Sequence, residues 1–196
     1  MSQTIQDLIT ALTGGDETRA EAAAAGLVAL PEALRPEALV TLPGLLAASQ
    51  ADQRWWAVRA LAALPAEDVV PLLLQALRDE DASVRQCALL GLRQRPDGRA
   101  IPELVTALDD PDPLVRRLAG DALEVIGSRA VPALLEVMAS GSHPAQLEAA
   151  RALAAIRDTR AVPALFEALD GSALLEYWAS EGLERMGVGM NYFIPD

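Results

Sequence analysis

The sequence predicts an all-α protein, an array of about six two-helix repeats, and three observations support this prediction. The stretch 100–127 recurs in variant form on both sides of itself. Prolines at the expected start of the first helix recur every 30 or 31 residues, at Pro71, Pro102, Pro132 and Pro163. The second helices share an alanine column with the same interval, at Ala57, Ala88, Ala119, Ala149 and Ala179. A fixed period of this length is typical of an array in which each repeat packs on its neighbours.

Two further columns keep the same phase. A small residue lies three positions after each alanine, at Ala60, Gly91, Ala122, Ala152 and Gly182, and a leucine follows it directly. The N-terminal segment joins with Ala23, Gly26 and Leu27. We therefore expect one elongated solenoid domain over residues 1–187, followed by a C-terminal tail, 188–196. Its repeats are expected at about 1–30, 31–65, 66–96, 97–127, 128–157 and 158–187.

Helix boundaries follow from apolar spacing and from breaking residues. In the first repeat an apolar stripe begins at Ile5 and ends before two glycines, and Asp16 is expected to be the N-cap of the next helix. In the second repeat Pro43 is expected to kink or split the first helix, because proline lacks an amide hydrogen. In the third, Ser83 and Gln86 have the spacing of a capping box, with Ser83 as N-cap.

The later repeats continue the pattern. Asp112 is expected to be an N-cap, with Pro113 at the first helical position. His143 occupies the same N-cap column one repeat later. The last helix is expected to end near Met186. The apolar tail that follows carries Met190, Tyr192, Phe193 and Ile194, and either covers the last core face or docks a partner.

Composition restricts the class of protein. Hydrophobic residues make up 52% and aromatic residues only 4%, so the core is expected to consist of Ala, Leu and Val. The net charge is -12 and all 16 basic residues are arginines, which disfavours nucleic acid as a partner because phosphate binding depends on clustered positive charge. A single cysteine predicts a reducing compartment. No run approaches the roughly 20 apolar residues of a membrane span and no signal peptide is visible, so a cytoplasmic location is expected.

Catalytic and metal chemistry find little support in the sequence. The acidic turns 79–81 and 109–112 lack the glycine and distal glutamate of a calcium loop, and are interpreted as helix caps. His143 has no second ligand nearby, and Cys87 is expected to be a buried, inert thiol. One histidine in a turn offers no nucleophile–base set. We therefore predict no catalytic residue, no metal and no cofactor.

Helical geometry predicts a binding surface on the second helices. Positions two before, one after, two after and five after each alanine point farthest from the buried stripe at 100° per residue. The one-after positions are Val58, Leu89, Gly120, Ala150 and Ser180. The candidate partner-binding residues on this surface are Trp55, Arg59, Leu90, Arg93, Arg117, Asp121, Leu147, Arg151 and Tyr177.

Two interpretations of these candidates remain open. The apolar residues are either anchors for a protein partner or packing between neighbouring repeats. The four arginines either hold acidic groups of a partner as two-pronged forks or pair with Asp121, Glu124 and Glu148 of the protein itself. Trp56, Cys87, Leu118 and Trp178 lie at the border of the stripe and are expected to fill the groove between repeats.

The segments 158–163 (DTRAVP) and 110–119 (DPDPLVRRLA) carry a family motif. An Asp-x-Arg-Ala-Val-Pro opening, an acidic turn and a Val-Arg-x-x-Ala helix resemble the HEAT-like repeats of phycobilisome lyases. The resemblance implies a right-handed α-α superhelix whose first helices form the convex side. Its second helices line the concave side, which is the usual binding surface of such arrays.

Within this resemblance the leading hypothesis is a non-catalytic scaffold that binds a protein or peptide in the concave groove. One alternative is a bilin-lyase-like subunit or chaperone that acts with a partner enzyme, with Trp55, Trp56, Tyr177 and Trp178 as stacking surfaces. Another is a structural array that associates with itself. The iron-binding His-Glu pairs of the related deoxyhypusine hydroxylases are missing, and so is the basic groove of helical-repeat DNA glycosylases. No membrane partner is expected, and the oligomeric state is left open.

Overall fold

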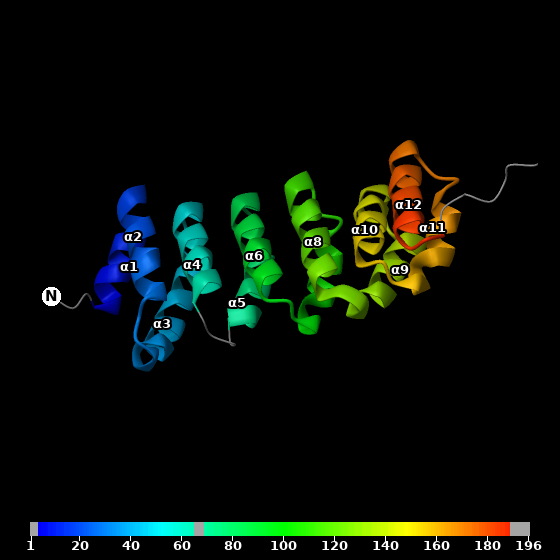
Figure 1. Ribbon diagram of the computed structural model, residues 1–196. Coiled ribbons are helices and arrows are strands. Elements are labelled where there is room, and N and C mark those ends of the chain that lie inside the picture. Colours follow the sequence, from blue (N-terminus) through cyan, green and yellow to red (C-terminus); the bar gives the residue numbers. More distant parts are fainter. Residues whose placement is uncertain (1–3, 65–68, 189–196) are drawn as a thin grey trace, which may run out of the picture. The chain divides into compact units, whose positions relative to one another are not determined.

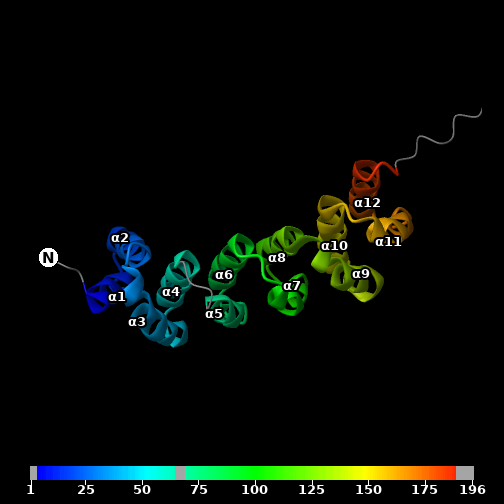
Figure 2. The same ribbon diagram turned by 60° about the horizontal axis from the view of Figure 1, so that its bottom comes forward.

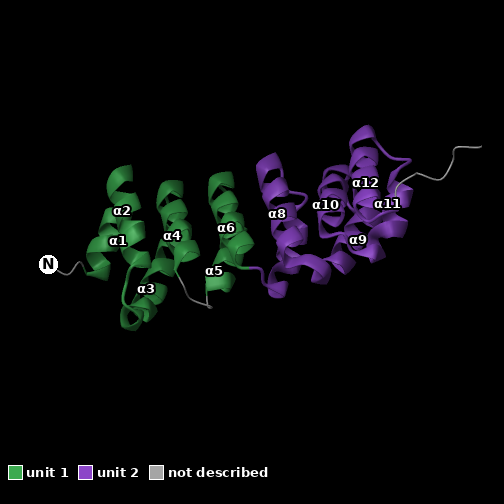
Figure 3. Ribbon diagram, in the orientation of Figure 1, with its two compact units in different colours: residues 1–95 green, residues 96–196 purple. Residues whose placement is uncertain are grey.

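The computed structural model describes residues 4–64 and 69–188. These residues contain twelve α-helices, five 3-10 helices and no strand, in the order of six helix pairs (Figure 1). The predicted all-α repeat fold is thus confirmed. The helices fall into two compact units, unit 1 over residues 1–95 and unit 2 over residues 96–196 (Figure 3), and each is described by itself.

Unit 1 contains the first three repeats. Its first helices are α1 (Ile5–Thr13), α3 (Arg35–Thr41) and α5 (Val69–Ala76), and its second helices are α2 (Glu17–Val28), α4 (Ala51–Ala63) and α6 (Ala82–Gln94). The 3-10 helices η1 (Glu32–Leu34) and η2 (Leu42–Ala47) flank α3. α4 packs on both α2 and α6, so the second helices form one layer and the first helices another (Figure 2).

Unit 2 repeats this arrangement more regularly. Its first helices are α7 (Ile101–Ala107), α9 (Val131–Ser140) and α11 (Val162–Ala168), and its second helices are α8 (Pro113–Ile126), α10 (His143–Ile156) and α12 (Ala173–Arg185). A 3-10 turn precedes each first helix: η3 (Gly98–Ala100), η4 (Gly127–Arg129) and η5 (Thr159–Ala161). α10 packs on α8 and on α12, and this layer of second helices is visible in Figure 2.

The alanine and small-residue columns lie in the core, where the second helices approach one another. All five alanines from Ala57 to Ala179 are fully buried. A Cβ atom added at Gly91 would lie 2.8 Å from the Cβ of Ala62 and 3.0 Å from Leu73 Cδ1. At Gly182 it would lie 3.0 Å from the backbone of Ala154. The column is therefore small because the second helix of the preceding repeat occupies the space that a side chain needs.

Three of the predicted helix boundaries are confirmed. The Asp16 carboxylate accepts a hydrogen bond from the amide of Arg19 at 3.0 Å, as an N-cap does. Asp112 accepts from the amide of Val115 at 2.9 Å, with proline at the first helical position of α8. α3 ends at Thr41, and the segment that contains Pro43 continues as the 3-10 helix η2.

Two predicted caps are wrong by one or two residues. The N-cap of α6 is Asp81, whose carboxylate accepts from the amide of Ser83 at 2.8 Å, so Ser83 lies inside the helix. The N-cap of α10 is Ser142, and His143 is the first helical residue. Proline is tolerated anywhere in a first turn, where the amides lack helical partners. α10 therefore begins one residue before its proline, Pro144, whereas α8 begins at its proline, Pro113.

The predicted tail lies almost wholly outside the described residues, including Met190, Tyr192, Phe193 and Ile194. Where the description ends, the amide of Val188 donates to the carbonyl of Leu183 at 2.8 Å after the left-handed Gly187. That bond closes the end of α12 in the manner of a glycine C-cap. The expected single domain over 1–187 stays a prediction.

Candidate functional site

The second helices carry large apolar side chains on the side that faces solvent. We call this side the second-helix face, the side of α2, α4, α6, α8, α10 and α12 that lies opposite the buried alanine column. At 100° per residue, six exposed large hydrophobic residues point within about 60° of that direction. These six residues are Val28, Leu90, Leu114, Val125, Leu174 and Tyr177. The face is therefore partly apolar in both units.

The exposed surface of the second helices is narrower than the binding surface predicted from the sequence. The column one residue after each alanine is buried in four of its five members: Val58, Leu89 and Ala150 have no exposed surface, and Gly120 is buried as well. Ser180, in the last of these helices, is exposed. The reason is that second helices pack against the second helices of adjacent repeats, in addition to their own first helix. The buried stripe is consequently wider than one that faces a single neighbour.

Three of the four arginines predicted on this surface pair with the protein's own carboxylates. Arg59 Nη2 lies 3.0 Å from Glu21 Oε1, and Arg117 Nε lies 3.5 Å from Asp121 Oδ1. Arg93, in the last turn of α6, is exposed and forms no ion pair with any described residue. The structure thus favours internal pairing for Arg59 and Arg117, and leaves only Arg93 open.

Arg151 is buried, which corrects its placement among exposed groove residues. Its side chain is 6% exposed and lies 2.8 Å from Asp121 Oδ1 and 2.8 Å from Glu148 Oε2. It also donates to the carbonyl of Arg117 at 3.0 Å. The guanidinium covers Gly120, where an added Cβ would lie 2.7 Å from Arg151 Nη2. Arg151 therefore ties α8 to α10 and is not available to a partner.

The remaining candidates lie on separate helices. Leu90 on α6 and Tyr177 on α12 are exposed, and Leu147 on α10 is half-buried. The ring of Tyr177 contacts that of Trp178 edge to face, with centroids 4.9 Å apart. Among the predicted site residues of unit 2, Arg117, Asp121 and Arg151 lie together in one cluster.

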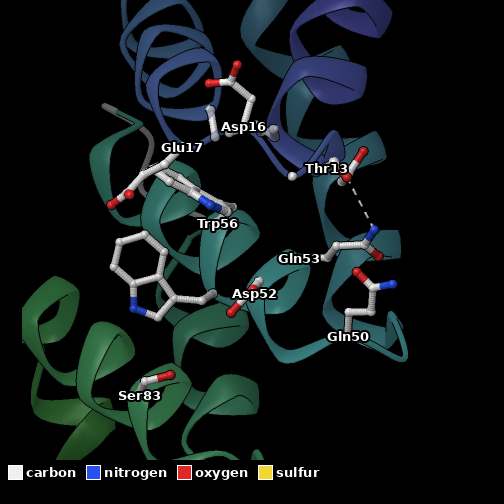
Figure 4. Close-up of a pocket in the computed structure, with 12 residues that line it drawn as sticks. Thr13, Asp16, Glu17, Gln50, Asp52, Gln53, Trp56 and Ser83 are labelled. Atoms are coloured by element: carbon white, nitrogen blue, oxygen red, sulfur yellow. Dashed lines mark hydrogen bonds between the residues drawn. The ribbon is translucent and has the colours of Figure 1, made fainter.

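Trp55 lines a pocket in unit 1, where α1 ends and α2, α4 and α6 begin (Figure 4). The pocket has a volume of about 520 Å³, within the range of ligand sites in proteins. Trp55 and Trp56 form a T-shaped pair, with centroids 4.8 Å apart and an interplanar angle of 87°. Gln53 donates to the carbonyl of Thr13 at 3.4 Å and so joins α4 to the end of α1 (Figure 4).

Three arginines lie three residues before the alanines of the column, and the sequence analysis assigned them no partner. They are Arg54, Arg85 and Arg116. Arg54 Nε and Nη2 donate to the two oxygens of Asp79 at 2.7 and 2.8 Å. Arg85 and Arg116 each donate to carbonyls of the turn before their own helix, at 2.8 Å to Asp79 and 2.7 Å to Asp110. The Val-Arg-x-x-Ala motif contains Arg85 and Arg116 and could have indicated this role, because a charged residue beside a buried column needs a fixed partner.

Cys87 is a buried free thiol. Burial raises the pKa of the Cys87 thiol to about 11, which keeps it protonated at neutral pH. Among the described residues, no three His, Cys, Asp or Glu side chains gather in a way that suits a metal ion. None of the helices described is both long and apolar enough to span a bilayer.

Comparison with known proteins identifies the repeat. The family model for HEAT repeats matches residues 38–124, 70–146 and 101–184, which together cover about three quarters of the chain. A search of curated proteins found no match.

Several solved structures share the fold. An engineered protein is 25% identical, with a TM-score of 0.53 over 96% of this chain and 98% of its own. The complex of CpcE and CpcF of phycocyanin lyase from Nostoc is 24% identical, with a TM-score of 0.55 over 95% of this chain and 78% of that one. A designed armadillo repeat protein in complex with the peptide (KR)4 is 19% identical, with a TM-score of 0.53 over 94% and 100%. With the repeat columns, the helix pairs and the family match in agreement, this chain belongs to the HEAT-repeat family.

Proposed function

We propose that this protein is a non-catalytic scaffold that binds a protein or peptide partner through its second-helix face. The observation that carries the proposal is the set of six exposed apolar residues on that face. Exposed apolar surface rimmed by charge is typical of protein-binding sites. Two of the similar structures are themselves complexes with a polypeptide, the CpcE–CpcF pair and the designed armadillo protein with its peptide. Those likenesses are at low identity, so they support the fold and no lyase activity is proposed.

The strongest anchor in unit 2 lies on α12. Leu174 is 61% exposed and Tyr177 55% exposed, and they are one helical turn apart. Tyrosine is frequent among the residues that carry binding energy, because it buries a large rigid ring and keeps a polar end. The Trp178 ring contacts it edge to face. A partner that covers this turn would bury both side chains.

Charge on the second-helix face argues for a partner with basic groups. Arg59 and Arg117 pair with the protein's own carboxylates, and Arg151 is buried among three of them, Asp121, Glu124 and Glu148. These pairs leave the arginines little free positive charge to offer a partner, in a chain of net charge -12. Complementary charge raises the rate and the selectivity of association. This replaces the expectation that the arginines hold acidic groups of the partner.

The test is an affinity capture with matched variants. Wild type and Leu174→Asp/Tyr177→Ala are used as bait in a cell extract, beside Val40→Asp, which alters an 81% exposed valine on the first helix α3. Proteins retained by each bait are compared by mass spectrometry. We expect a protein that is retained by wild type and Val40→Asp and lost with the double variant. Identical captures by all three baits would contradict a partner site on α12.

A further inference from the structure

The pocket of unit 1 is lined by several acidic side chains. The described residues that line it include three exposed carboxylates, Asp16, Glu17 and Asp52, and none of them is basic. Thr13, Gln50, Gln53 and Ser83 complete the polar part of the lining. Two buried apolar residues, Leu12 and Ala20, lie among the lining residues as well. The pocket thus combines apolar and aromatic surface with an acidic rim.

Helix ends oppose this acidic charge only in part. α2, α4 and α6 begin at the pocket, and each helix N-terminus carries about +0.5 of an elementary charge. In α2 and α6 the carboxylates of Asp16 and Asp81 already accept the first free amides. Three full negative charges exceed three half charges of the opposite sign. The pocket is therefore expected to attract a cation.

The tryptophan pair selects the kind of cation. A positive group over the face of a tryptophan ring gains about 0.5–2 kcal/mol, depending on its exposure. The two rings stand at right angles to each other, and both tryptophans line the pocket. An arginine suits such surroundings, because its aliphatic stem packs on apolar surface while its planar head stacks on an indole and forms paired hydrogen bonds with a carboxylate. The carboxylates are not gathered as ligands of a metal ion within the described residues.

We infer that this pocket binds an arginine side chain of a basic segment in the partner protein. The inference rests on the proposed function, since it names one residue type of the polypeptide that the scaffold holds. Glu17 and Asp52 meet the guanidinium, and Trp55 and Trp56 cover its flat face and its stem. Asp16 adds charge while it continues to cap α2.

The experiment titrates three peptides against the protein and follows tryptophan fluorescence. The first alternates arginine and glycine, the second has citrulline in place of arginine, and the third has glutamate. Citrulline keeps the shape of arginine and removes its charge. The protein carries Trp178→Phe, so that its fluorescence comes only from Trp55 and Trp56. We expect the arginine peptide to bind at least about tenfold more tightly than either of the others.

Two carboxylate variants locate the site. Glu17→Gln/Asp52→Asn changes exposed side chains and is expected to weaken binding of the arginine peptide about tenfold or more. The control, Glu136→Gln, removes an exposed carboxylate of the first helix α9 in unit 2 and leaves the affinity unchanged. Equal binding of the citrulline peptide, an unaffected pocket variant, or no binding to the wild type would each overturn the inference. These outcomes leave the capture on Leu174 and Tyr177 untouched, so the two proposals fail separately.

Discussion

Replacement of Arg54 by methionine should destabilise unit 1 strongly. The Arg54 side chain is 8% exposed, and that of its partner Asp79 is 9% exposed. The guanidinium holds both Asp79 oxygens, at 2.7 and 2.8 Å, and donates to the carbonyls of Ala48 and Ser49 at 3.0 and 3.3 Å. It therefore joins the start of α4 to the turn that precedes α6.

The expected loss follows from what the substitution leaves behind. Removal of one member of a buried ion pair costs about 3–5 kcal/mol, mostly because the other charge stays buried without a partner. The two carbonyls also lose a donor, but they lie near the surface and water can replace it in part. We therefore expect Arg54→Met to lower the free energy of unfolding by at least about 3 kcal/mol. That is a large share of the 5–15 kcal/mol typical of a domain.

The assay is urea unfolding in a Trp178→Phe background, where fluorescence reports on Trp55 and Trp56 of unit 1. Arg54→Met/Asp79→Asn serves as the control, because asparagine removes the buried charge and keeps an oxygen for the amide of Asp81, which Asp79 accepts at 2.9 Å. The double variant should regain more than half of the lost stability. A loss below about 1 kcal/mol in the single variant would refute the reasoning.

The same pair predicts a pH dependence. Burial by itself would raise the pKa of Asp79, but the hydrogen bonds from Arg54 and from the Asp81 amide hold that pKa below its ordinary value of 3.8. A lowered pKa gives stability that is complete above the unfolded pKa and is lost as pH falls through the folded one. In Arg54→Met burial remains without the guanidinium, so Asp79 takes up a proton at higher pH. The stability gap between wild type and variant should narrow from pH 7 to pH 3, and a constant gap would contradict the role of the charge.

Three further predictions concern the core and the caps. Gly91→Ala should lower the free energy of unfolding by about 1–3 kcal/mol, since its Cβ would overlap Ala62, whereas Gly44→Ala, with no atom within 4 Å, should change it little. Asp16→Ala should cost about 1 kcal/mol in the same urea assay through the lost cap of α2, and an unchanged midpoint would contradict that cap. Cys87, buried and with its pKa raised to about 11, should resist a thiol reagent such as dithionitrobenzoate at pH 7 until urea unfolds the protein. Rapid labelling of the native protein would show that the site opens.

The repeat columns predicted the fold because each column has one physical cause that recurs. A residue that contacts a neighbouring helix must be small in every repeat. Ala57 and Ala179 are both fully buried for this reason, and the requirement appears in the sequence as a periodic alanine. Pro43 acts through its own missing amide, which needs no knowledge of neighbours. Cap positions were harder. Asp81 and Ser83 both carry acceptors near the same free amides, and only the backbone decides which of them lies outside the helix.

The charges of the second-helix face escaped prediction for a related reason. Arg93, Arg117 and Arg151 lie on the same side of their helices, at three different positions of the repeat. Arg93 forms no ion pair within the described residues, Arg117 is paired at the surface and Arg151 is buried. Arg151 differs because of the residue that faces it on α8: Gly120 has no side chain, so Arg151 can lie flat over it and reach Asp121. Helical geometry predicts the side of the helix from which a side chain starts, but the role of a long side chain depends on the residue opposite. The pocket beside Trp55 makes a similar point, because its acidic rim comes from the starts of two different helices, α2 and α4, which periodicity alone does not bring together.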